Sequence, residues 1–211
     1  IAARCMVGQT LLEQKVGAER AIEHFAVKEA VFPFNKFPTV DPLLGPEMKS
    51  TGEVMGVGRT FGEAFAKSQL AGGVGLPEGG TALITVRDGD KPHAVKLAGE
   101  LCEAGFRIVA THGTAAAISE AGVECTVVNK VKEGRPHLVD MIKNGEIQLV
   151  VNTTEGKRAI EESRSIRITA LRYKVAYFTT IAGAQASCTA LADGRTAQVY
   201  SLQSIQAAIP A

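Results

Sequence analysis

The sequence contains few cysteines and no closely spaced cysteine pair. Its four cysteines are Cys5, Cys102, Cys125 and Cys188, and its four histidines do not show the HExxH spacing of a metalloprotease. In a chain of 211 residues, four scattered cysteines are typical of free thiols and not of a disulfide framework, and a zinc site needs more closely spaced ligands. We therefore expect reduced thiols, as in a cytoplasmic protein, and no metal site.

The sequence also lacks a long hydrophobic run and a strong excess of charge. No segment approaches the roughly 18 consecutive apolar residues of a membrane span, and the formal net charge is +1. We therefore expect no membrane segment and no general attraction to nucleic acid, so any anion site must be local. The N-terminus has no initiator methionine and no signal-peptide pattern, which indicates a piece of a longer polypeptide.

The segment 71–80 is the most glycine-rich window of the chain and predicts a linker. Before it, we expect a helix within residues 1–12, a strand within 26–37, a strand at 53–57 and a helix capped by Thr60 and Glu63. These elements are too few to close a core. Residues 1–72 are therefore expected to be the end of a larger domain, and residues 73–211 a second domain.

After the linker, short apolar segments alternate with amphipathic ones. Strands are expected at 81–87, 106–110, 124–128, 147–151 and 174–178, and helices at 92–101, 114–121, 136–144, from 157 onward and at 181–191. Strands that alternate with helices at short spacing form right-handed βαβ units. The expected fold is an α/β domain with a parallel, Rossmann-like sheet and helices on both faces.

Small polar side chains follow nearly every expected strand. They are Asp88, Asp90 and Lys91, then Thr111, His112, Gly113 and Thr114, then Asn129 and Lys130, then Asn152, Thr153 and Thr154, and finally Thr179 and Thr180. The carboxyl ends of parallel strands meet at one edge of the sheet, where ligands bind in open α/β folds. Lysines supply charge, while hydroxyls and helix N-termini bind oxygen atoms, so the sequence predicts a site for a phosphate and a sugar.

Each of these residues alone also has a simpler explanation. Thr114 and Thr154 could be helix N-caps, and Lys91 and Lys130 could be solvated surface charges. The recurrence of such residues at the strand ends favours one binding site over several separate explanations. No acidic residue ends the second to fifth strands, so the pocket is expected to hold an anion without a base to transform it.

Four segments closely resemble the C-terminal end of the large chain of carbamoyl-phosphate synthase. They are residues 32–61 (FPFNKFPTVDPLLGPEMKSTGEVMGVGRTF), 111–115 (THGTA), 128–137 (VNKVKEGRPH) and 152–167 (NTTEGKRAIEESRSIR). The resemblance implies that residues 1–72 end the second ATP-grasp unit. It also implies that residues 73–211 form an allosteric domain with a fold similar to methylglyoxal synthase.

The resemblance further implies that the allosteric domain binds UMP as an inhibitor and IMP at an overlapping site. The residues that match this nucleotide site are Lys91, Thr111, Gly113, Thr114, Lys130, Asn152, Thr153 and Thr154, with Lys157 where the family often has Arg. All but Lys157 are also strand-end residues identified above from the pattern alone.

An ornithine site is also implied, to which Glu29 and Thr179 correspond. Phe178 stands where ornithine-responsive members of the family have Asp. We therefore expect weak or absent activation by ornithine, and we expect an Asp at position 178 to strengthen it.

For the full-length enzyme, the resemblance implies ATP-dependent synthesis of carbamoyl phosphate from bicarbonate and glutamine-derived ammonia, for arginine and pyrimidine biosynthesis. ATP, Mg or Mn, and K would be required, and a small glutaminase subunit and the rest of the large chain would be partners. A homo-oligomer is a further option. The family's catalytic residues and metal ligands lie upstream, so this chain alone is expected to be inactive and to need no cofactor.

Two other functions stay open. One is an enzyme of the methylglyoxal synthase type, which eliminates phosphate from a triose phosphate. The other is a pure interaction module that acts through the proline-rich loop from Pro38 to Met55.

Overall fold

The computed structural model describes residues 1–17, 22–36, 42–44, 47–50, 52–193 and 198–207, and the chain divides into two compact units. One unit comprises residues 1–24 and 199–211 and holds the helices α1 (Ala2–Met6) and α9 (Leu202–Ala207). Gly8 lies two residues after α1 and has a φ of +97°, a left-handed conformation that glycine adopts readily and that ends the helix. The helix expected within residues 1–12 therefore ends before Gly8 and does not continue to Leu12.

The second unit, residues 25–198, contains all the strands of the described chain. Its strands are β1 (Phe25–Val31), β2 (Gly52–Gly58), β3 (Gly80–Thr85), β4 (Phe106–Thr111), β5 (Thr126–Val128), β6 (Leu149–Asn152) and β7 (Ala176–Phe178). Its α-helices are α2 (Phe61–Ala71), α3 (Lys91–Glu103), α4 (His112–Glu120), α5 (Leu138–Lys143), α6 (Lys157–Glu162), α7 (Arg164–Arg172) and α8 (Ile181–Ala192). The described part of this unit also contains the short 3-10 helices η1 (Phe34–Lys36), η2 (Asp88–Asp90) and η3 (Val131–Glu133).

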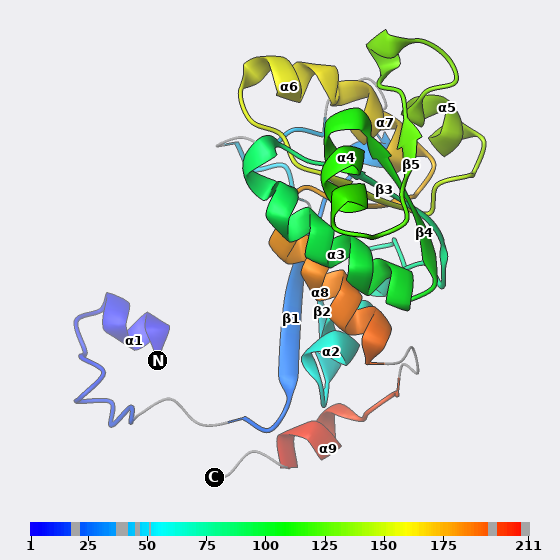
Figure 1. Cartoon of the computed structure of the whole chain (residues 1–211). Helices are drawn as coiled ribbons and strands as arrows, with labels where there is room; N and C mark the ends of the chain where they lie inside the picture. Colours follow the sequence, from blue (N-terminus) through cyan, green and yellow to red (C-terminus); the bar gives the residue numbers. More distant parts are fainter. Residues whose placement is uncertain (18–21, 37–41, 45–46, 51, 194–197, 208–211) are drawn as a thin grey trace. The chain divides into compact units, whose positions relative to one another are not determined.

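The main sheet has five parallel strands in the order β5-β4-β3-β6-β7. The chain builds outward from β3 on one side through β4 and β5 (Figure 1). It then continues on the other side of β3 through β6 and β7. The predicted parallel α/β fold is therefore confirmed. The direction of winding reverses between β3 and β6, and ligands of open α/β sheets bind at such a point.

Helices cover both faces of this sheet, as predicted. Alternate strand residues such as Ala82 and Ile84 point to a core shared with α3, α4 and α8. Their neighbour Leu83 points to the opposite core, which is shared with α5 and α7. Because the inner strands β3, β4 and β6 are largely buried on both faces, their sequences are mostly continuous apolar runs.

The strands β1 and β2 form a separate antiparallel pair, and α2 packs closely against it. Gly56 faces the backbone of α2, because a Cβ atom there would lie 2.0 Å from the carbonyl oxygen of Ala64. Gly62 of α2 has a similar contact with α8, because its Cβ atom would lie 2.9 Å from the carbonyl oxygen of Thr189. Glycine at these two positions allows α2 to approach both neighbours.

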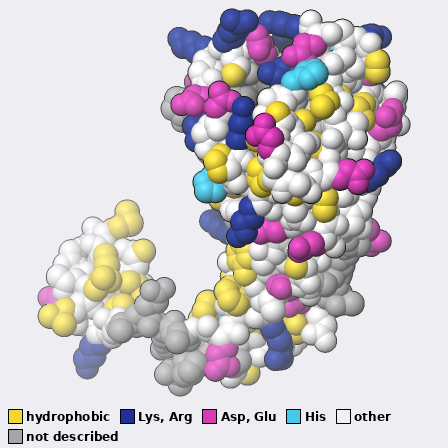
Figure 2. Space-filling view, in the orientation of Figure 1, with side chains coloured by type: hydrophobic (Ala, Val, Ile, Leu, Met, Phe, Trp, Pro, Cys, Tyr) yellow, Lys and Arg dark blue, Asp and Glu magenta, His cyan; other side chains and the backbone are white. Residues whose placement is uncertain are grey.

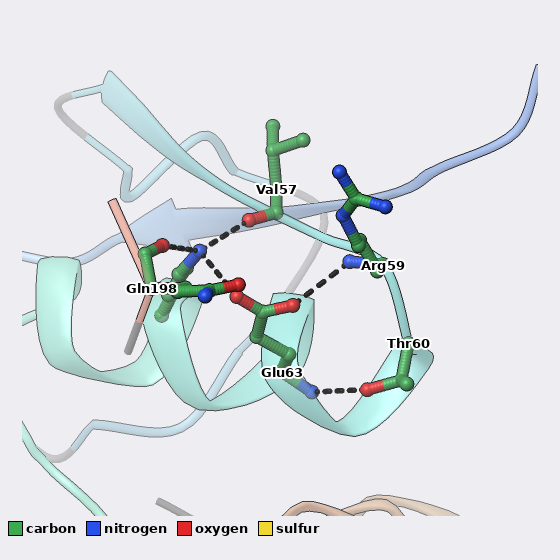
Figure 3. A network of polar contacts seen from close by, with 6 residues as sticks. Val57, Arg59, Thr60, Glu63 and Gln198 are labelled. Atoms are coloured by element: carbon green, nitrogen blue, oxygen red, sulfur yellow. Dashed lines mark hydrogen bonds and ion pairs between the residues drawn. The ribbon is translucent and has the colours of Figure 1, made fainter. Parts of the chain in front are cut away.

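A polar network fixes the start of α2 (Figure 3). The hydroxyl of Thr60 accepts a hydrogen bond from the backbone N–H of Glu63 at 3.1 Å, which confirms the predicted cap. The Glu63 carboxylate accepts one from the backbone N–H of Arg59 at 2.8 Å and another from the ammonium of Lys67 at 2.8 Å. Lys67 also donates to the carbonyl of Gln198, so the network ties α2 to the end of the unit.

Phe178 lies in the core and not at a surface. Its side chain is 8% exposed and packs with residues of α8 such as Ala184 and Cys188. A carboxylate at this position would be buried without a partner, which the sequence alone did not indicate.

We predict that Phe178→Asp destabilises the chain. Loss of a buried Phe side chain costs about 3–5 kcal/mol, and burial of a charge adds to this cost. Urea unfolding measures the change. The control Phe178→Leu keeps most of the apolar volume and should cost less than about 1.5 kcal/mol. A Phe178→Asp variant as stable as the control would contradict the prediction.

Candidate anion-binding site at the carboxyl edge of the sheet

A cavity of about 730 Å³ lies at the point where the winding of the sheet reverses. Its walls come from the ends of β3 and β6, from η3 and from the helices α5, α6 and α7. The predicted residues that line it are Lys130, Asn152, Thr153 and Thr154. Four of the predicted residues therefore converge on one cavity. In Figure 2, basic and acidic side chains are interspersed at the end of the molecule where α6 lies in Figure 1.

Thr111 and Thr114 support the wall of this cavity from behind. The hydroxyl of Thr111 lies 3.1 Å from the hydroxyl of Thr85, a cavity residue at the end of β3. The hydroxyl of Thr114 accepts a hydrogen bond of 3.3 Å from the backbone N–H of Val86. Both threonines are at least 97% buried. The explanation of Thr114 as an N-cap is wrong, because α4 begins at His112 and Thr114 lies inside its first turn.

Lys91 reaches the N-terminus of α4 because of Gly113. A Cβ atom on Gly113 would lie 3.2 Å from the ammonium nitrogen of Lys91, so a side chain there would crowd the lysine. No side chain in the described structure caps α4, since the hydroxyl of its N-cap residue Thr111 bonds elsewhere. An ammonium group beside free helix N–H groups favours an anion.

The turn after β3 is hydrogen-bonded to the turn after β6. The hydroxyl of Thr153 accepts from the backbone N–H of Arg87 at 3.2 Å, and the backbone N–H of Thr153 donates to the carbonyl of Thr85 at 3.1 Å. The Arg87 guanidinium pairs with Asp90 at 2.9 Å. The hydrogen bond from Arg87, and to a smaller extent the one from Thr153, lowers the pKa of the Asp90 carboxyl. Thr153 therefore has a structural role at the wall of the cavity.

Carboxylates line the cavity alongside the basic residues, and only Asp88 among them belongs to the strand-end pattern. They are Asp88, Glu133, Glu155, Glu161 and Glu162. Asp88 lies 2.8 Å from the Lys91 ammonium, and this contact, with a smaller contribution from Lys130, lowers the pKa of Asp88. Lys91 therefore already has a partner within the chain.

Glu162 of α6 forms a second group of ion pairs at the cavity. One of its oxygens lies 3.0 Å from Lys132 of η3 and 3.0 Å from Arg158 of α6, and these two hydrogen bonds lower the pKa of Glu162. Arg158 lines the cavity, whereas Lys157, the predicted residue, is exposed at the start of α6 and is not part of the lining. The i,i+4 spacing of Arg158 and Glu162 was the sequence signal for this pair.

The residues that correspond to an ornithine site lie elsewhere. The Glu29 carboxylate on β1 accepts a hydrogen bond of 2.6 Å from the Gln69 amide of α2, and partial burial raises the pKa of Glu29. Thr179 is exposed directly after β7. No hydrogen bond between Glu29 and Thr179 occurs in the described chain.

Among the described residues, no group of three or more His, Cys, Asp and Glu side chains is arranged to hold a metal ion. No helix within the described ranges is long and apolar enough to cross a membrane.

Comparison with known proteins identifies part of this chain directly. Residues 93–179 match the family described as MGS-like domain. This segment spans β4, β5, β6 and β7 and the helices between them, and it includes the cavity residues of β6 and η3.

Curated relatives match the whole chain, including the part before the MGS-like domain. The carbamoyl phosphate synthase large chain of Ralstonia nicotianae is 60% identical over 99% of this chain, and that of Pseudomonas aeruginosa is 56% identical over 100%. The resemblance predicted from the sequence is thus confirmed. The chain spans 19% and 20%, respectively, of the length of these relatives.

A solved structure of methylglyoxal synthase from Elizabethkingia anophelis also resembles this chain. The two are 25% identical, with a TM-score of 0.43, and the match covers 52% of this chain and 77% of that one.

We predict that Thr114→Val destabilises the chain by about 1–3 kcal/mol, because the backbone N–H of Val86 loses its buried acceptor. Thr114→Ser keeps the hydroxyl and is the control for this bond. Urea unfolding gives the stability, and amide hydrogen exchange at Val86 should become faster only in the valine variant. Equal stability of the two variants would mean that the hydrogen bond does not matter.

Proposed function

We propose that this chain is the regulatory C-terminal portion of a carbamoyl-phosphate synthase large chain, and that its MGS-like domain binds UMP and IMP. The proposal is carried by one observation, the convergence of strand-end residues on a cavity at the β3–β6 reversal point. The high identity to carbamoyl phosphate synthase large chains supports the wider assignment.

The phosphate binds between the N-terminus of α4 and the ammonium groups of Lys91 and Lys130. It takes the place of the Asp88 carboxylate, which pairs with Lys91 in the described structure. A phosphate dianion is a stronger partner than a carboxylate for two lysines and a helix N-terminus. Binding therefore exchanges an internal counter-ion for the ligand.

The sugar and base occupy the cavity toward Asn152 and Thr154. A volume of about 730 Å³ suits a ligand of the size of a nucleoside monophosphate, because small-molecule pockets measure roughly 300–1,000 Å³. Lys157 adds charge at the entrance in this proposal, and Arg158 adds charge from the cavity wall.

The chemistry of the proposed full-length enzyme belongs to the part of the large chain outside this sequence. Residues 1–72 are the end of an ATP-grasp unit in this proposal, and ornithine binds near Glu29 and Thr179. ATP, Mg or Mn, K, bicarbonate and glutamine-derived ammonia are handled by the rest of the enzyme and its small glutaminase subunit. No residue of this chain is assigned a catalytic role, and none of the described groups fits a metal.

Lyase activity of the methylglyoxal synthase type is less well supported by the cavity. Proton abstraction from a triose phosphate needs a carboxylate whose pKa lies near the working pH. The cations beside Asp88 and Glu162 lower the pKa values of both carboxyls. The interaction-module alternative rests on the loop from Pro38 to Met55, part of which lies outside the described residues.

We predict that UMP and IMP bind this chain and that Lys130→Ala weakens binding of UMP about tenfold to a hundredfold. A lysine contact to phosphate is a hydrogen bond to charge, worth roughly 1.5–3 kcal/mol. Calorimetry measures affinity, which should also fall as salt rises. The melting temperature should change little, because the Lys130 side chain is exposed.

The matched control is Lys143→Ala, which removes the same charge from an exposed position on α5 outside the cavity. It should leave UMP affinity unchanged. Absence of UMP and IMP binding to the unmodified chain would overturn the proposed function, and an equal loss in both variants would place the site elsewhere.

We also predict that the chain alone makes neither carbamoyl phosphate from ATP nor methylglyoxal from dihydroxyacetone phosphate. Enzyme assays against the uncatalysed rate check both reactions. Methylglyoxal formation would establish the lyase alternative, and carbamoyl phosphate formation would show that this chain carries catalytic residues of its own.

A further inference from the structure

Tyr177, a residue outside all the sequence patterns above, contacts one of the proposed ligand-binding residues. The Asn152 side-chain amide nitrogen Nδ2 donates a hydrogen bond of 2.7 Å to the Tyr177 hydroxyl. Asn152 ends strand β6 and Tyr177 lies in strand β7, and these two strands pair in parallel with Val150 opposite Tyr177. Asn152 lies two residues beyond Val150, so it and Tyr177 point to the same face of the sheet.

This hydrogen bond leaves the other end of the Asn152 amide for the cavity. Asn152 is 4% exposed and lines the cavity, and no other described residue bonds to its side-chain oxygen Oδ1. No fully buried side-chain oxygen or nitrogen in the described structure lacks a partner. The Oδ1 atom therefore keeps access to the open space of the cavity, as a hydrogen-bond acceptor held in place by the tyrosine.

We propose that Tyr177 is a positioning residue that fixes the Asn152 amide with its carbonyl oxygen toward the ligand. This inference rests on the proposed function and deepens it, because it names the chemistry of the group that Asn152 contacts. A carbonyl oxygen accepts hydrogen bonds and repels phosphate oxygens. The ligand group at Asn152 is therefore a hydroxyl or an N–H group of the sugar or base, and the phosphate binds elsewhere in the site.

The two ends of the site then have opposite preferences. Lys91 and the uncapped N-terminus of α4 offer positive charge and N–H donors, whereas Asn152 offers a fixed acceptor. A ligand with a phosphate at one end and a neutral donor at the other is bound in one orientation. Inorganic phosphate uses only the first end and does not depend on Asn152.

The test compares Tyr177→Phe with the unmodified chain, using UMP and inorganic phosphate as probes in calorimetry. Without its hydroxyl partner the Asn152 amide is free to rotate, so UMP should bind roughly tenfold more weakly. Inorganic phosphate should bind with unchanged affinity. Tyr173→Phe is the matched control, because Tyr173 is 47% exposed and lies at the end of α7, and it should change neither affinity.

A double-variant cycle tests whether the tyrosine acts through Asn152. In an Asn152→Ala background, Tyr177→Phe should have no further effect on UMP binding. An undiminished effect in that background would overturn the positioning role. Equal weakening of UMP and inorganic phosphate by Tyr177→Phe would show that Asn152 contacts the phosphate, which would overturn the assigned ligand chemistry.

A measurement without ligand separates this inference from the proposed function. In the unmodified chain, the Asn152 side-chain NH₂ signals in an NMR spectrum should exchange slowly with solvent, and they should exchange faster in Tyr177→Phe. Unchanged exchange would overturn the inference even if UMP binds. Failure of the unmodified chain to bind UMP would overturn the proposed function, and the exchange data would still decide whether Tyr177 holds the amide.

Discussion

The parallel pairing of β3 with β6 is the constraint on which the rest of the site depends. The register places Thr85 opposite Asn152, at the last residues of both strands. The chain winds in opposite directions from this pair, and the cavity lies beyond the ends of these two strands. The two turns are then held together by a hydrogen bond from the backbone N–H of Arg87 to the Thr153 hydroxyl and by one between the backbone groups of Thr153 and Thr85.

Several cations at the site are paired within the chain. Lys91 pairs with Asp88, and Lys132 and Arg158 share Glu162, so these three side chains already have carboxylate partners. Exposed ion pairs of this kind contribute little to stability, because water screens them. Their effect in the proposed function is on binding, since an anion must compete with a carboxylate already in place, and the site favours ligands that carry more charge than a carboxylate.

The fold was predictable from the sequence because the sheet strands are short apolar runs separated by glycine-containing turns. The predicted start of α4 was two residues too late, because His112 and Gly113 have low helix propensity. The close approach of Lys91 to Gly113, which favours glycine at this position, is visible only in the structure. The strand-end rule found Lys130 and Asn152 at the cavity. It missed Glu162 and Tyr177, because neither residue follows a strand. Glu162 lies in helix α6 and Tyr177 within strand β7, and only tertiary packing brings Glu162 to the cavity and Tyr177 to Asn152.

The strand β7 has three residues, and two of them serve opposite faces of the sheet. Tyr177 points toward Asn152, and Phe178 packs into the core with α8. A slip of β7 by one residue would exchange the two side chains, which would bury a phenol hydroxyl under α8 and place a benzyl group beside the amide. Both errors are unfavourable at once. This short edge strand is thus kept in register by the binding face and the core together, although it has few backbone hydrogen bonds to hold it.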